Sequence, residues 1–127
     1  MKGSIITGAI FGALAVALGA FGAHALKGVL TDYGAGIWDT AVQYQMFHAT
    51  GIIAVGILMH PRLLGDTTSL KWAFLCMSLG ILFFSGSLYT LAVSGIGTLG
   101  AITPIGGVLF IIGWILLLVS VAKSRIF

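Results

Sequence analysis

The sequence predicts an all-α integral membrane protein: a bundle of four antiparallel transmembrane helices with both termini in the cytoplasm. Three observations lead to this prediction. Hydrophobic residues make up 59% of the 127 residues and charged residues only 7%, whereas a soluble domain carries about 25% charged residues. Four apolar segments each approach the ~20 residues that a helix needs to cross the hydrocarbon layer. Lys and Arg residues gather at one end of these segments.

The four segments are separated by short connections, and lipid forces each of them to be helical. The hydrocarbon layer offers no hydrogen-bond partner, so every backbone group must bond within its own helix. Short connections make consecutive helices antiparallel neighbours, so we expect one domain over residues 1–127. The expected spans are residues 4–25, 41–59, 71–93 and 103–122, with an interfacial start of the second near residue 32.

The first segment ends in "LGAFGAHAL", in which Ala23-His24-Ala25 is an A-x-A triplet of the kind that signal peptidases cleave. However, its apolar run of about 20 residues is longer than the 7–15 of a signal peptide. Small residues also recur along one face of this segment, which lets transmembrane helices approach closely. We therefore expect a retained helix, and we expect glycines to be helix-packing residues in the first and last segments. These glycines are Gly8, Gly12, Gly19, Gly22, Gly106 and Gly113.

Basic residues predict the orientation, because cytoplasmic loops of membrane proteins carry an excess of Lys and Arg. Five of the six basic residues fall on the side of the two termini, and only Lys27 falls on the other side. We therefore expect a cytoplasmic-membrane protein with both termini in the cytoplasm. The five residues are Lys2, Arg62, Lys71, Lys123 and Arg125.

The composition argues against several classes of function. The net charge is +3, but the basic residues are scattered, so we expect no nucleic-acid partner. The chain has no glutamate, no serine elbow and no phosphate-binding loop, and we therefore expect neither an enzyme nor a cofactor. The single Cys76 rules out an intrachain disulfide. The expected partners are the lipid bilayer and either a second copy of the chain or another membrane protein.

Polar side chains inside a membrane are costly and mark candidate functional sites. Counted by depth, such side chains from three segments fall in the outer half of the membrane, with His48 within roughly 10 Å of the outer surface. Gln45 and His48 lie one helical turn apart. We expect His48 to be neutral and hydrogen-bonded, and to face the first or third helix. The candidate binding cluster comprises His24, Gln45, His48, Ser85, Ser87 and Tyr89.

Several roles stay open for this cluster. Buried His and Gln can simply join helices, at about 0.6 kcal/mol per hydrogen bond. They could instead line a transporter or channel site for a small solute, a lipid or a proton. Ligation of haem or a metal by His24 and His48 is a third alternative, although no carboxylate or thiolate accompanies them. The leading expectation is a structural or interaction role in the membrane. Trp114, deeper in its span, is expected to pack or to face lipid.

Four motifs follow one another along the chain: "LGAFGAHAL", "AVQYQMFHA", "FSGSLY" and "TPIGGVLFIIGW". In this order and spacing they resemble the bacterial family called domain of unknown function 423, whose eukaryotic relatives are the transmembrane protein 256 group. That family is described as small four-span membrane proteins without an assigned activity. The resemblance therefore implies the fold and leaves the function open. It also implies that the motif positions are His24, Gln45, His48, Ser85, Ser87, Tyr89, Pro104, Gly106 and Gly107.

Overall fold

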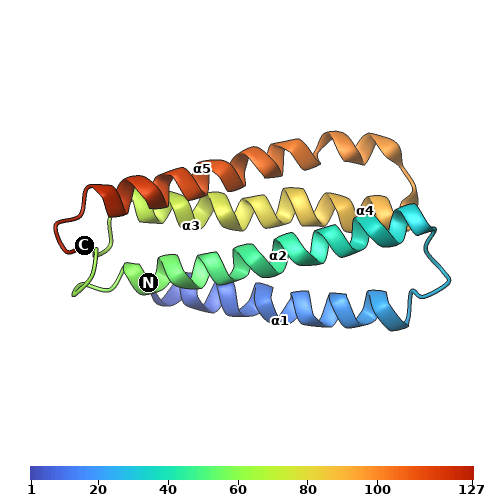
Figure 1. The fold of residues 1–127 in the computed structure, drawn as a ribbon, viewed down its shortest axis with the longest axis horizontal. Coiled ribbons are helices and arrows are strands. Elements are labelled where there is room, and N and C mark those ends of the chain that lie inside the picture. The colour runs from blue at the N-terminus through green and yellow to red at the C-terminus, as the bar shows by residue number, and fades with distance from the viewer.

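The computed structural model describes all of residues 1–127 and contains only helices and their connections (Figure 1). Four helical stretches are long and apolar enough to cross a membrane, which confirms the predicted four-helix fold. The elements are α1 (Lys2–His24), α2 (Asp32–Leu58), α3 (Thr68–Gly80), the π-helix η1 (Ile81–Ser85), α4 (Gly86–Ser94), the 3-10 helix η2 (Gly97–Ala101) and α5 (Thr103–Ala122).

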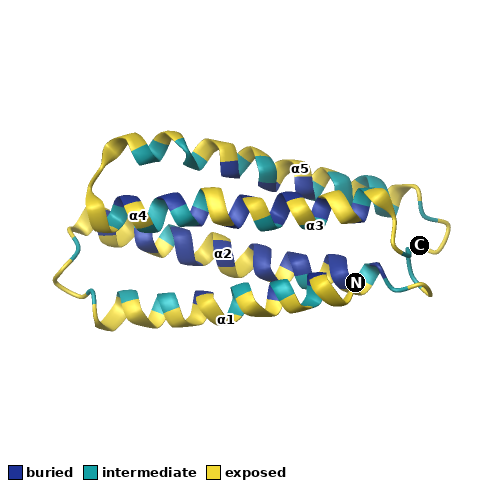
Figure 2. Ribbon diagram, turned by 180° about the vertical axis from the view of Figure 1, so that it is seen from behind, coloured by how far each residue is buried: buried dark blue, intermediate teal, exposed yellow.

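The helices stand side by side in chain order, with both termini at the same end of the molecule (Figure 1). The continuous third span, made of α3, η1 and α4, packs against α2 on one side and α5 on the other, and α1 packs against α2. Helix α2 is therefore covered from two sides, and 50% of its apolar window is buried, against 11% for α1 (Figure 2). The outward surfaces of α1 and α5 are left to lipid or to other membrane components.

Helix α2 begins at Asp32, earlier than the predicted span that starts at residue 41. Thr31 caps this end, because its side-chain oxygen accepts a hydrogen bond from the Gly34 amide at 3.0 Å. The predicted interfacial turn is thus the first part of one unbroken helix. As a consequence His48 lies 16 residues after the helix start, which corresponds to about 24 Å along the axis.

Contacts between α1 and α2 place the central polar residues near mid-length of the bundle. The Gln45 side-chain amide donates a hydrogen bond to the carbonyl of Phe11, and Phe11 lies near the middle of α1. One helical turn away, Gly8 lies against the backbone of Ala49. Gln45 and His48 thus lie further along α2 than a helix start at residue 41 implies, because the helix begins nine residues earlier, at Asp32.

Four of the predicted packing glycines lie where a side chain would collide with the neighbouring helix. An added Cβ would meet the Ala49 carbonyl oxygen at 2.8 Å from Gly8, and Met77 Cγ at 2.7 Å from Gly113. From Gly22 it would overlap the Trp38 ring, and from Gly106 it would overlap the backbone of Phe84. Gly19 has a looser contact, at 3.3 Å from Val42. Small residues at these positions let the helices approach closely.

Gly12 does not make the contact expected of it, because an added Cβ there would meet nothing within 4 Å. The buried residues of α1 are Ser4, Gly8 and Ala15, and Gly12 lies to one side of the line that they form. The predicted face of small residues on α1 is therefore in contact with α2 at Gly8, Gly19 and Gly22, but not at Gly12. Two further glycines, Gly56 and Gly80, also lie in close contacts, against Ile5 and Phe110.

Candidate functional site

The side chain of Gln45 joins three of the four spans. Its amide nitrogen donates to the Phe11 carbonyl of α1 at 2.9 Å. Its amide oxygen accepts a hydrogen bond from the Tyr89 hydroxyl of α4 at 2.7 Å. Gln45 is 3% exposed, so both hydrogen bonds lie in the interior, where they fix the rotation of α1 and α4 relative to α2.

His48 is buried between α2 and α5, with both ring nitrogens in use. Nδ1 lies 2.7 Å from the Tyr44 carbonyl oxygen, and Nε2 lies 3.1 Å from the Trp114 indole nitrogen. A carbonyl can only accept and an indole N–H can only donate. The arrangement therefore fits a neutral imidazole with its proton on Nδ1. Its ring also stacks on Phe110, with 3.5 Å between the ring centroids and an interplanar angle of 11°.

This geometry corrects two expectations. His48 faces the fourth span rather than the first or third, and Trp114 is a hydrogen-bond partner as well as a packing residue. The partners are 66 residues apart in the chain, so no local pattern connects them. The depth of His48 can be compared with that of Trp114 only once the start of α2 is known to be Asp32.

The two serines of "FSGSLY" connect the third span to different neighbours. Ser85 donates to the Ala41 carbonyl of α2 at 2.7 Å. Ser87 shares a hydrogen bond of 2.7 Å with the Thr103 hydroxyl of α5. Ser85 ends the π-helical segment η1. Such π-helical turns are rare in proteins, and those that occur are often found at functional sites.

His24 lies apart from these residues, at the exposed end of α1. It follows Phe11, the contact of Gln45, by 13 residues, which is about 20 Å along the helix. The six predicted residues therefore form separate pairings and not one cluster. His24 and His48 cannot bind the same metal or haem from these positions, and His48 has no free nitrogen. No group of three or more His, Cys, Asp or Glu residues is placed to hold a metal ion.

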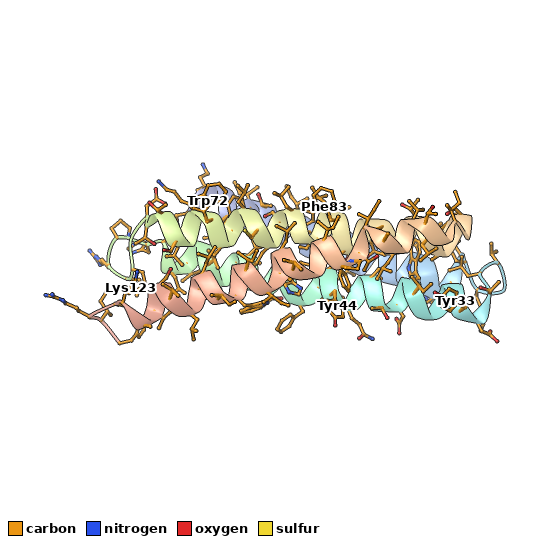
Figure 3. All side chains as sticks on the ribbon, turned by 90° about the horizontal axis from the view of Figure 1, so that it is seen from above. Tyr33, Tyr44, Trp72, Phe83 and Lys123 are labelled. Carbon is orange, nitrogen blue, oxygen red and sulfur yellow. The ribbon has the colours of Figure 1, made fainter.

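Every buried side-chain nitrogen or oxygen has a hydrogen-bond partner within the chain. Hydrogen bonds between helices thus use the polar side-chain atoms of Gln45, Ser85, Ser87 and Tyr89. Trp38 belongs to the same set. It is buried, and its indole nitrogen donates to the Leu18 carbonyl at 2.9 Å. In contrast Trp72 and Tyr33 are exposed near opposite ends of the molecule (Figure 3), and aromatic residues of membrane proteins are enriched at the two membrane surfaces.

A groove of about 690 Å³ runs between α2 and α5, over the η1 segment. Its walls are mostly aromatic, and the exposed amide of Gln43 adds one polar group. Figure 3 shows Tyr44 at one edge of the bundle and Phe83 at the opposite edge. No pattern in the sequence predicts this groove. The rings that line it are Tyr44, Phe47, His48, Phe84, Phe110 and Trp114.

Comparisons with known proteins agree with this architecture. The family described as "Protein of unknown function (DUF423)" matches residues 18–107. The chain is 49% identical over 125 residues to the UPF0382 membrane protein SH2409 of Staphylococcus haemolyticus, covering 97% of this chain and 98% of the relative. It is 50% identical over 124 residues to the UPF0382 membrane protein YwdK of Bacillus subtilis, with the same coverage. No solved structure matches. The chain therefore belongs to the DUF423 family of membrane proteins of unknown function.

Proposed function

We propose that this protein is a non-catalytic component of the cytoplasmic membrane that acts by binding another membrane constituent, either a lipid or another membrane protein. The observation that supports this role is the complete internal pairing of the buried polar side chains. Catalysis needs a polar group that is free to meet a substrate, and the interior offers none. The outward surfaces of α1 and α5 and the groove between α2 and α5 remain for contacts with other molecules.

The alternative of a transporter or channel needs a polar route along the whole bundle. The half of the bundle near the termini is instead filled by a hydrophobic cluster that includes Ile52, Val55, Leu70 and Met77, none of them measurably exposed. Because protein interiors are close-packed, water or an ion would have to displace these side chains. The structure of one chain therefore favours a binding role over conduction.

The charge distribution supports an orientation with both termini in the cytoplasm. The termini lie at one end of the bundle, together with the connection between α2 and α3 that carries Arg62 (Figure 1). Lys27 lies in the connection between α1 and α2 at the other end. Labelling of single cysteines with an impermeant reagent in intact cells, in a Cys76→Ser background, tests this. Ser94→Cys should react and Ser124→Cys should not, and the reverse pattern would overturn the orientation.

The binding role is tested by native mass spectrometry of the protein extracted in mild detergent. We expect the spectrum to show the chain with a retained lipid or a second polypeptide, in a fixed ratio. Proteoliposomes provide the opposing measurement. Flux of protons or small solutes above the level of empty vesicles, abolished by Gln45→Leu and retained by the exposed-site control Thr50→Val, would contradict the proposal.

A further inference from the structure

We propose that the groove between α2 and α5 binds a flat conjugated ring that carries a carbonyl oxygen and an apolar tail, the chemistry of a membrane-dissolved quinone. This inference rests on the proposed binding role and names the class of ligand. Three independent features of the groove lead to it: its series of stacked ring pairs, its exposed amide and the space left at Gly107. All three lie near mid-length of the bundle, where a molecule dissolved in the bilayer interior can reach them.

Three ring pairs in the lining of the groove are stacked in series, whereas Phe47 and Trp114 are steeply inclined to the His48 ring, at 87° and 61°. Tyr44 and Phe84 have centroids 4.3 Å apart at an interplanar angle of 26°. Tyr44 and Phe110 are 6.3 Å apart at 27°, and the His48 ring continues the series on Phe110 at 11°. Aromatic rings attract one another in offset stacks. A flat ring can therefore extend this series, whereas an acyl chain would gain only the contacts that it already makes with other lipids.

The polar contact for such a ring comes from Gln43. Gln43 and Gln45 lie two residues apart on α2, but Gln45 is buried with its amide fully used while Gln43 is exposed at the groove. Thr50, another exposed polar residue of α2, bonds its own backbone at the Met46 carbonyl. An amide in hydrocarbon without a partner is costly. The Gln43 N–H groups can donate to a ligand carbonyl oxygen, which an acyl chain lacks.

The α5 side of the groove has open space at residue 107, because this residue is a glycine. An added Cβ at Gly107 would come no closer than 3.9 Å to any neighbour, the nearest being Phe84 Cδ2. In contrast Gly106 lies directly against the backbone of Phe84. Phe84 belongs to the π-helical segment η1. The contact with Gly106 thus holds Phe84 of η1 in the lining of the groove, and Gly107 leaves space beside it. The volume of about 690 Å³ falls within the range of small-molecule sites, about 300–1,000 Å³, which are typically lined by aromatic residues with few polar groups.

The test is a titration of the protein in phosphatidylcholine nanodiscs with a decyl-substituted benzoquinone. Trp114 lines the groove, so its fluorescence reports a bound ring, and a Trp72→Phe background removes the exposed indole at the end of the bundle. We expect saturable quenching that 1-dodecanol, a chain without a ring, does not reverse. Gly107→Leu fills the space on the α5 side of the groove and should weaken binding at least about tenfold. Gln43→Leu should weaken it several-fold.

Gly12→Leu is the matched control, because an added Cβ at Gly12 also meets open space but lies on α1, away from the groove. It should bind like the parent. Gly107→Ala, with a smaller intrusion and a melting temperature measured alongside, separates loss of binding from loss of folding. Quenching that rises without saturation, or equally in Gly107→Leu and the parent, would overturn the proposal. So would displacement by dodecanol, which indicates an acyl-chain site, or a dimer that Gly107→Leu dissociates.

Failure of this inference differs from failure of the binding role. If mass spectra show a retained phospholipid or protein while the quinone does not saturate, the ligand class is wrong and the binding role stands. If no membrane constituent is retained and the protein catalyses flux, the proposed function itself is wrong.

Discussion

The half of the bundle near the termini and the half near the α1–α2 connection are held together in different ways. In the first, α2, α3 and α5 meet through apolar side chains, among them Ile52, Met59 and Met77. In the second, side-chain hydrogen bonds such as those of Trp38 and Ser85 cross from one helix to the next. Lipid is as apolar as leucine, so close packing in the first half supplies dispersion contacts rather than a hydrophobic driving force. The second half adds directional bonds that specify how the helices are rotated.

The largest expected effect is in the apolar half. Met77→Ala should lower the free energy of unfolding by about 2–5 kcal/mol, because it leaves a cavity where α3, α5 and Gly51 of α2 meet. The measurement is reversible unfolding in mixed detergent micelles. Met46→Ala, at an exposed position of α2, is the control and should change little. Equal stability of the two variants would show that the apolar half is loosely packed.

The second expected effect compares a glycine of α1 that lies against α2 with one that faces open space. Gly8→Leu should destabilise the protein by about 1–3 kcal/mol, or more, because the side chain must displace α2 at Ala49. Gly12→Leu, one turn further along α1, should be tolerated because nothing lies within 4 Å of an added Cβ. Thermal melting in mild detergent compares them. A greater loss for Gly12→Leu would mean that another chain covers that face in the folded protein.

The third effect concerns the junction of the two halves at His48. His48→Ala should cost about 1–3 kcal/mol, because it leaves the Trp114 N–H and the Tyr44 carbonyl without their partner. Trp114→Phe removes the indole donor but keeps a ring, and should cost less. A double-mutant cycle measures the interaction directly. A coupling energy near zero would show that this hydrogen bond does not help to hold α5 against α2.

The smallest effect is expected in the polar half. Tyr89→Phe deletes only the hydroxyl that bonds Gln45, and hydrogen bonds between membrane helices average about 0.6 kcal/mol. Gln45→Leu removes the bonds to both α1 and α4 and should cost more than Tyr89→Phe. Unfolding in mixed micelles again gives the values. If Tyr89→Phe were as damaging as Met77→Ala, hydrogen bonds rather than packing would dominate the bundle.

The sequence by itself determined the four spans, their antiparallel order and the asymmetry of charge. These follow from the length of apolar runs and the positions of Lys and Arg, which are properties of each segment alone. It also identified close-contact glycines such as Gly8 and Gly106, because small residues at helical spacing form a smooth face.

Only the tertiary structure decided how the helices are rotated and offset. Helices such as α1 are apolar on every side, so hydropathy cannot indicate which face meets a neighbour. That is why Gly12 lies free of contacts and His48 turns to Trp114. The capped start of α2 at Asp32 shifted the depth of its polar residues, which left His24 apart from them. The groove exists because α2 and α5 pack on the same third span, and no single segment encodes that relation.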